Sequence, residues 1–314
     1  MSDAPGPRRA NPVQVSVSAA GLASSRRDRI RADLFLLLVA LVWGSAFVAQ
    51  RLGMEQVGPF AFNATRFAVG GLTLIPVLGW RRLRSLSRTE LRSGLLLGLL
   101  LFVAASLQQF GLVWTTAGKA GFITGLYIVI VPLLLALAWR KWAAWNSWLG
   151  AGLATVGLFL LSVQAGLQLA AGDQWVLISA LVWALHVIAV GRFVRGRDPL
   201  RLALVQYAVC SLLSIPATLL LEPGTWSGLL LAVPAVLYAG VLSIGLGYTG
   251  QIVAQQHTSP THAAIILSLE SVFAALSGWL VLGEALAPRQ LVGCGLMLAG
   301  MLLAQVPRAG GDWA

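Results

Sequence analysis

Apolar residues along the chain gather into long runs separated by short polar stretches. Ten such runs can be marked, at residues 33–52, 60–80, 92–114, 117–138, 147–164, 174–191, 200–221, 228–252, 260–282 and 289–306. A helix of about 20 residues crosses the hydrocarbon core of a bilayer, whereas a membrane-spanning β-strand needs only about half that length. The pattern therefore predicts an all-α, integral membrane bundle of ten transmembrane helices.

The composition agrees with lipid as the surrounding solvent. Hydrophobic residues make up 58% of the chain and charged residues only 11%, whereas about a quarter of the residues of a soluble domain are charged. The two cysteines, Cys210 and Cys294, both lie inside apolar runs. Neither a disulfide framework nor a metal site is predicted, and no cofactor is expected.

Positive charge is distributed unevenly between the loops. Of the 22 lysines and arginines, 18 lie before the first run, after the last, or near the loops after the second, fourth and sixth runs. Because positively charged loops stay in the cytoplasm, both termini are expected there, in a multi-pass protein of the cell inner membrane. The net charge of +11 is then a topology signal, and no nucleic-acid partner is expected.

The chain contains an internal repeat. ALVW occurs at 40–43 and at 180–183, and the same offset places Pro59 over Pro199 and Pro76 over Pro216. Further on, WLGAGLATVGLFLL aligns with LVGCGLMLAGMLLA. Each copy holds five spans, and an odd number inverts the second copy in the membrane. We expect a disordered cytoplasmic tail at 1–29, five-helix repeats at 30–165 and 172–307, and a cytoplasmic tail at 308–314.

Three stretches carry a resemblance to a known family. LVWGSAFVAQRLGMEQVGPFAFNATRFAVGGL, AGKAGFITGLYIVIVPLLLAL and SPTHAAIILSLESVFAALSGWLVLGEALAPRQLVG are similar to the drug/metabolite transporter superfamily, in its ten-helix EamA-type family. The resemblance implies a carrier that is not an enzyme, commonly an exporter of amino acids or other small metabolites. It would work by alternating access around a central cavity between two inverted repeats.

Two tryptophans stand out from the others. Most of the twelve tryptophans lie near span ends, as an interfacial belt would require, but Trp43 and Trp183 lie about halfway along their spans and are mates in the repeat. They are candidate aromatic walls of a central cavity, the alternative being ordinary packing. Phe47 and Gln50 share a helical face with Trp43 and join it as candidate substrate-binding residues.

Glu270 is the carboxylate that lies deepest within a predicted span. Ionisable residues inside a membrane are costly and are functional candidates by default. The hypothesis is that Glu270 takes up and releases a coupling proton, with His262 as a second coupling candidate on the same polar face. A structural, hydrogen-bonded carboxylate is the alternative.

The other intramembrane polar residues sort by depth into one cluster for each gate. Arg66, Gln108, Gln109 and Lys119 are expected toward the outer side, and Gln206, Gln251, Gln255 and His262 toward the cytoplasm. Arg66 would suit a carboxylate or phosphate on the substrate, unless it extends to the membrane interface. The remaining candidate substrate-binding residues are Gln108, Tyr127, His186, Tyr248 and Gln251.

The site candidates leave several functions open. A small-molecule substrate is expected, most plainly an amino acid, aromatic and apolar ones included, because a neutral or zwitterionic solute suits two tryptophans, one carboxylate and several amides. A nucleotide-sugar or phosphorylated-metabolite exchanger is the alternative among transporters, and a membrane sensor or scaffold is the alternative of another class. The lipid bilayer is the expected surrounding, and both a monomer and a homodimer fit the sequence.

Overall fold

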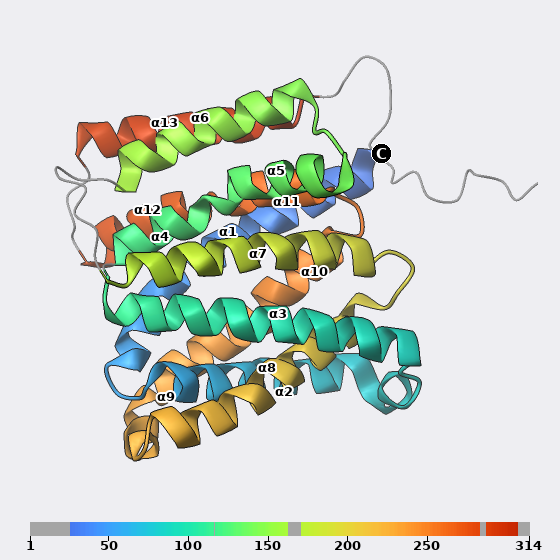
Figure 1. Cartoon of the computed structure of the whole chain (residues 1–314), viewed down its shortest axis with the longest axis vertical. Coiled ribbons are helices and arrows are strands. Elements are labelled where there is room, and N and C mark those ends of the chain that lie inside the picture. The colour runs from blue at the N-terminus through green and yellow to red at the C-terminus, as the bar shows by residue number, and fades with distance from the viewer. Residues whose placement is uncertain (1–25, 116, 163–170, 283–286, 307–314) are drawn as a thin grey trace, which may run out of the picture.

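The computed structural model describes residues 26–115, 117–162, 171–282 and 287–306. Within these ranges the secondary structure is helical and contains no strand. The long helices lie side by side with their axes roughly aligned across the molecule (Figure 1). The all-α prediction is confirmed.

The first repeat comprises α1 (Arg26–Met54), α2 (Pro59–Arg84), α3 (Arg88–Val113), α4 (Ala117–Gly125) with α5 (Tyr127–Trp139), and α6 (Trp145–Ser162). Seven segments of the described chain are long and apolar enough to span a membrane, and three shorter apolar helices complete the ten spans. The predicted runs are therefore confirmed. Helix α1 begins at Arg26, before the expected end of the tail at residue 29, and Asp28 in its first turn favours that start through the helix dipole.

The second repeat follows the same plan. It comprises α7 (Asp173–Phe193), α8 (Pro199–Leu221), the short 3₁₀ turn η2 (Thr225–Gly228), α9 (Leu229–Leu237), the π-helical segment η3 (Tyr238–Tyr248), α10 (Thr249–Ala254), α11 (Pro260–Leu267), α12 (Glu270–Leu282) and α13 (Pro288–Ala304). Segments α9, η3 and α10 form one span, and α11 with α12 form the next.

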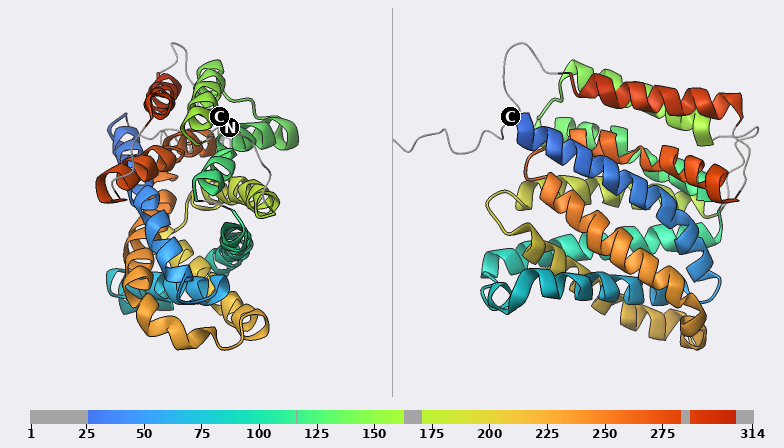
Figure 2. Two further views of the ribbon diagram at one scale, coloured as in Figure 1. Left: turned by 90° about the vertical axis from the view of Figure 1, so that its left-hand side faces the viewer. Right: turned by 180° about the vertical axis from the view of Figure 1, so that it is seen from behind.

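Helices α6 and α13 pack as a pair at one edge of the bundle (Figure 2). A Cβ atom added to Gly150 would lie 2.5 Å from the Gly300 carbonyl oxygen, and one added to Gly157 would lie 2.5 Å from that of Gly293. Gly157 and Gly300 are mates in the repeat, as are Gly150 and Gly293. The close contact therefore has the two-fold symmetry that two inverted repeats require.

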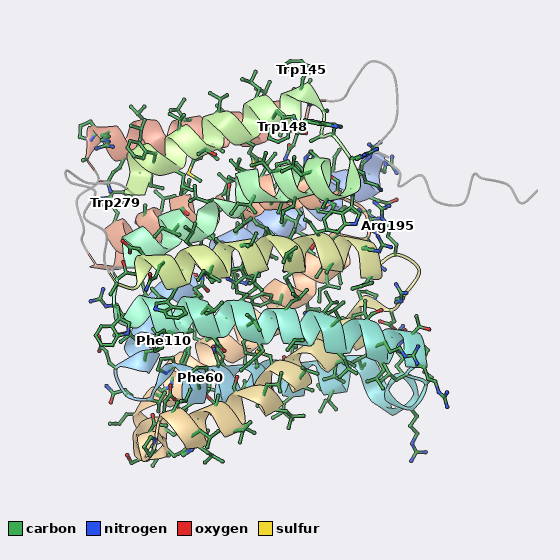
Figure 3. The ribbon with its side chains drawn as sticks, in the orientation of Figure 1. Phe60, Phe110, Trp145, Trp148, Arg195 and Trp279 are labelled. Carbon is green, nitrogen blue, oxygen red and sulfur yellow. The ribbon has the colours of Figure 1, made fainter. Side chains whose placement is uncertain are left out.

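The two ends of the bundle can be told apart by the chain segments that lie there. The start of α1 and the end of α13 lie at one end, here called the terminal end, and the α1–α2 and α8–α9 connections lie at the opposite end (Figures 1 and 2). Trp145 and Trp148 lie near the terminal end, and Phe60, Phe110 and Trp279 near the opposite end (Figure 3). Aromatic residues at both ends are typical of a protein that spans a bilayer.

Two large groups of buried side chains fill the interior. One group joins α1, α5, α6, α7, α11 and α13, and the other joins α2, α3, α7, α8, η3 and α10. Trp43 packs against both groups. The boundary between them, at the middle of α1 and α7, is where the polar residues of the spans converge.

Candidate functional site

A cavity of about 40 Å³ lies at this boundary and is lined by both repeats. Ten of its lining residues are sequence candidates: Trp43, Phe47, Gln50, Arg66, Gln108, Tyr127, Trp183, Tyr248, Gln251 and Glu270. Four more were not proposed from the sequence: Thr124, Val187, Ser243 and Leu267. Repeat symmetry offered a signal for one of these, because Val187 is the mate of the candidate Phe47 at the offset that also relates Trp183 to Trp43.

Three aromatic rings form one wall of the cavity. Tyr248 lies between the two tryptophans, with its ring centroid 4.6 Å from that of Trp43 and 5.7 Å from that of Trp183. The Trp183 and Tyr248 rings are stacked, with 25° between their planes. An aromatic wall of this kind offers apolar area and a π-face to a bound solute.

The π-helical segment η3 holds this wall in place. A π-helix shifts the backbone hydrogen-bond ladder, and the Ser243 carbonyl oxygen accepts a bond of 3.0 Å from the Trp43 indole Nε1–H. A Cβ atom on Gly247 would collide with that indole nitrogen. Glycine at this position therefore allows the Trp43 ring to lie against the segment that carries Tyr248.

Arg66 contributes a buried positive charge to the cavity. Its Nε donates to Asn63 Oδ1 at 3.0 Å and its NH1 donates to Gln50 Oε1 at 2.9 Å, while the guanidinium lies over the rings of Phe62 and Phe67. No described carboxylate lies within 4 Å of it. A buried charge without a counter-ion is costly, so this position favours an anionic ligand group.

Glu270 contributes a buried carboxyl group from the second repeat. It is the first residue of α12, as its repeat mate Tyr127 is the first residue of α5, and both follow interruptions in their spans. The Leu126 N–H bonds the Ile123 carbonyl at 3.2 Å and the Leu269 N–H bonds the Ile266 carbonyl at 3.1 Å, so each span tightens before the cavity. Interrupted helices at mid-membrane are a recurring feature of transporter binding sites.

Glycine also brings α1 against the second interruption. A Cβ atom on Gly44 would lie 2.5 Å from the Glu270 carbonyl oxygen. The backbones of α1 and α12 therefore approach closely at this depth. Glu270 is 5% exposed, and its side chain lines the cavity from the far side of this contact.

Several polar atoms at the cavity have no hydrogen-bond partner. They are the Trp183 indole nitrogen, the Tyr127 hydroxyl and the Gln251 side-chain oxygen. Gln108 instead donates to Thr124 Oγ1 at 2.9 Å. Buried polar groups are normally paired, so these donors and acceptors are available to water or a ligand. With one guanidinium, one carboxyl group and an aromatic wall, the lining offers groups complementary to a small zwitterion.

Two candidates lie outside the cavity lining. His186 is fully buried behind the wall, with its Nε2 3.0 Å from Gln206 Oε1. His262 lies near the terminal end, where its Nε2 is 3.9 Å from Asp33 Oδ2. His262 was expected in the polar cluster toward the cytoplasm, whereas His186 was expected to face the cavity. Within the described ranges no group of three or more His, Cys, Asp or Glu side chains is arranged to hold a metal ion.

A polar contact joins the two repeats at each end of the bundle. At the opposite end, the Glu222 carboxylate accepts the backbone N–H groups of Phe60 at 2.9 Å and Ala61 at 3.0 Å, at the start of α2. At the terminal end, the Glu90 carboxylate accepts from Arg201 at 3.2 Å and from the Asp198 N–H at 3.4 Å, at the start of α8. Because α2 and α8 are repeat mates, the two carboxylates bind equivalent helix starts, although Glu222 and Glu90 are not themselves mates in the repeat.

Comparison with known proteins tests the family resemblance independently of the structure. The profile of the EamA-like transporter family matches residues 30–163 and again residues 170–305. An "Uncharacterized transporter" of Archaeoglobus fulgidus is 33% identical over 88% of this chain and 86% of its own length. The threonine/homoserine exporter RhtA of Escherichia coli is 27% identical over 89% of this chain and 93% of its own.

One more curated relative and one solved structure are also similar to this chain. A probable terminal-alkyne amino-acid exporter of Streptantibioticus cattleyicolor is 24% identical over 85% of this chain and 91% of its own. A solved structure described only as "Crystal structure of protein" has a TM-score of 0.72 and covers 88% of this chain and 96% of its own, at 20% identity, and it shows the fold alone. The double profile match and the full-length relatives establish that the chain belongs to the EamA-like transporter family.

Proposed function

We propose that the protein carries amino acids, including aromatic and apolar ones, across the cell inner membrane by alternating access around this cavity. The observation that supports the proposal most strongly is the pair of opposite charges, Arg66 and Glu270, that line the same cavity from different repeats. The family and its relatives are transporters, which are not enzymes.

The two charges match the two ends of a zwitterion. The substrate carboxylate binds the Arg66 guanidinium, for which carboxylate is the preferred partner. The substrate ammonium binds Glu270, and the side chain lies along the aromatic wall of Trp43, Tyr248 and Trp183. Burying both charges of the substrate in this way compensates the two charges of the site at once.

A phosphorylated substrate fits this lining less well. Among the described residues that line the cavity, Arg66 is the one cation and Glu270 is a carboxylate. A phosphate group carries more negative charge than one guanidinium neutralises, and Glu270 would repel it. The lining therefore favours an amino acid over a nucleotide sugar or phosphorylated metabolite.

The relatives support export as the direction. Two of them are named exporters, one of threonine and homoserine and one of a terminal-alkyne amino acid. With the arginine-rich terminal end in the cytoplasm, the substrate enters the cavity from the terminal end and leaves at the opposite end. The repeats 30–165 and 172–307 rock against each other during this cycle.

The size of the cavity fits a closed intermediate of such a cycle. Ligand sites usually enclose about 300–1,000 Å³, whereas this cavity measures about 40 Å³. An amino acid therefore requires one end to open, and the contacts of Glu222 and Glu90 are the parts of the two ends that must separate in turn.

Glu270 also provides a means of coupling transport to protons. A carboxylate buried at mid-membrane is a functional candidate, and a proton and a substrate ammonium neutralise the same negative charge. In this scheme Glu270 carries a proton in one direction and releases it when the ammonium binds.

Transport in proteoliposomes that contain the purified chain tests the proposal. Uptake of radiolabelled amino acids is measured with and without an imposed pH gradient, for the wild-type protein, Trp43→Ala and Glu270→Gln. We expect uptake by the wild type, about a tenfold loss in Trp43→Ala, and no response to the gradient in Glu270→Gln. An absence of amino-acid uptake by the folded wild type would contradict the proposed substrate class.

A further inference from the structure

Beyond the cavity, three buried polar side chains from three segments meet on its terminal side. His186 on α7, Gln206 on α8 and Gln255 at the end of α10 are each fully buried. His186 Nε2 lies 3.0 Å from Gln206 Oε1, and Gln255 Nε2 donates to the Val187 carbonyl at 3.0 Å. These contacts join the three residues, here called the terminal-side cluster, across the three segments.

Each member of the cluster also has a polar atom without a partner. These atoms are His186 Nδ1, Gln206 Nε2 and Gln255 Oε1. Because an amide oxygen only accepts, the ring Nε2 donates to it, and Nδ1 of the neutral imidazole is then an acceptor. The cluster thus presents two acceptors and one amide N–H group with no protein partner, although unpaired buried polar groups cost free energy.

The terminal-side cluster is continuous with the cavity wall. The His186 ring packs edge-on against Trp183, with centroids 5.8 Å apart, and against Tyr248, with centroids 6.5 Å apart. Gln255 lies one helical turn beyond the cavity-lining Gln251, and His186 lies one turn beyond Trp183 in the direction of the terminal end. The aromatic wall therefore separates the cavity from the cluster by one layer of side chains.

One residue of the terminal-side cluster has a repeat mate that lines the cavity. Gln206 is the repeat mate of Arg66, at the same offset that relates Trp183 to Trp43. Arg66 is a cation and is tied to Gln50 and Asn63, whereas Gln206 is neutral. The two positions are expected on opposite sides of the membrane midplane, one with charge and one without.

We propose that His186, Gln206 and Gln255 form a second, uncharged subsite on the transport path, which binds the polar groups of the substrate between the cavity and the terminal end. The inference rests on the proposed amino-acid transport. A path through a membrane needs hydrogen bonds that replace those of water, but binding weak enough to let the solute move on. Neutral donors and acceptors satisfy both requirements, while the charges of Arg66 and Glu270 bind the substrate at the cavity.

Thiol accessibility tests whether the cluster lies on the path. In a Cys210→Ser/Cys294→Ser background, the full-length Gln206→Cys protein in liposomes is treated with a charged methanethiosulfonate reagent from each side separately. Ala203→Cys is the matched control, because Ala203 is equally buried, on the same helix and closer to the terminal end. We expect Gln206→Cys to react at least tenfold faster than Ala203→Cys, and from one side only.

The accessibility results separate the two proposals. Equal rates for Gln206→Cys and Ala203→Cys would overturn the subsite, since the cluster would then be no more accessible than a buried packing position. Faster labelling of Gln206→Cys that amino acids slow supports both the subsite and the substrate class. Faster labelling that no amino acid slows would overturn the subsite as a place for amino acids, whereas the proposed function is decided separately by uptake in proteoliposomes.

A transport measurement tests the same subsite without a reagent. The His186→Leu/Gln206→Leu variant removes both partners of the hydrogen bond, so neither polar group is left alone. Gln256→Leu is a control for the loss of an amide closer to the terminal end, where Gln256 bonds to the Arg197 carbonyl. We expect the double variant to transport at least tenfold more slowly while binding the amino acid within about threefold of the wild type. Wild-type transport by the folded double variant would overturn the subsite.

Discussion

At the scale of single residues, the two central tryptophans differ in what their indole nitrogens do. Repeat symmetry predicts equivalent positions for Trp43 and Trp183, and both line the cavity. The Trp43 nitrogen is bonded to the Ser243 carbonyl, whereas the Trp183 nitrogen has no partner. Symmetry in the sequence therefore places both rings but does not assign their hydrogen bonds, which depend on the π-helical segment present in one repeat.

Replacing each tryptophan with phenylalanine should separate stability from binding. Trp43→Phe leaves the Ser243 carbonyl without its buried donor, and we expect a loss of about 1–3 kcal/mol in the free energy of unfolding. Trp183→Phe removes an unpartnered donor, so we expect little loss of stability but about five- to tenfold weaker substrate binding. Unfolding in detergent and equilibrium binding measure the two effects, and equal stability losses in both variants would contradict the assignment.

Sequence periodicity could identify much of the site because most candidates lie on uninterrupted helical faces. Trp43, Phe47 and Gln50 share one face of α1, and all three line the cavity. Tyr248 was a candidate, but its place between the tryptophans depends on the wider turns of η3, which follow no 100° periodicity. His186 was expected to face the cavity, yet it lies behind Trp183 because the wall already fills that position.

At the scale of helices, the spans were predictable and their interruptions were not. Runs of apolar residues predict where each span lies in the chain, and arginine-rich loops predict which ends of the spans face the cytoplasm. The interruptions at Leu126 and at Ser268–Leu269 carry no proline, and Pro132 lies within the continuous α5. They are stabilised by tertiary packing around the cavity, such as the approach of Gly44 to Glu270, which local sequence does not reveal.

The glycines of α6 offer a matched test of helix packing. A Cβ atom on Gly157 would meet the Gly293 carbonyl, whereas one on Gly152, in the same helix, would meet nothing within 4 Å. We expect Gly157→Ala to lower the free energy of unfolding by about 1–3 kcal/mol, because α6 and α13 must move apart. Gly152→Ala should be neutral or slightly stabilising, and a similar loss in both variants would show that the α6–α13 contact is not the cause.

At the scale of the whole molecule, a carboxylate joins the two repeats at each end of the bundle. Glu222 binds the start of α2 at the opposite end and Glu90 binds the start of α8 at the terminal end, and in each case the helix belongs to the other repeat. The sequence predicts the inversion and one polar cluster for each gate. It does not predict these carboxylates as closing groups, because both lie in or beside connections whose path depends on the packed structure.

Removing each carboxylate should open a different end. Hydrogen bonds to a charged group contribute about 1.5–3 kcal/mol, so Glu222→Ala should raise the population open at the opposite end by about tenfold or more, and Glu90→Ala the population open at the terminal end. Hydrogen exchange of the intact protein, followed by mass spectrometry, reports the change at each end. Faster exchange at the same end in both variants would contradict alternating closure by these contacts.

The central claim is that Arg66 and Glu270 bind the two charges of one amino acid. The most direct measurement is equilibrium binding of an aromatic amino acid, its N-acetyl derivative and its methyl ester to the wild type, Arg66→Gln and Glu270→Gln. We expect the wild type to prefer the free amino acid at least tenfold, Glu270→Gln to lose its discrimination against the N-acetyl derivative, and Arg66→Gln to lose its discrimination against the ester. Wild-type selectivity in both folded variants would contradict the claim.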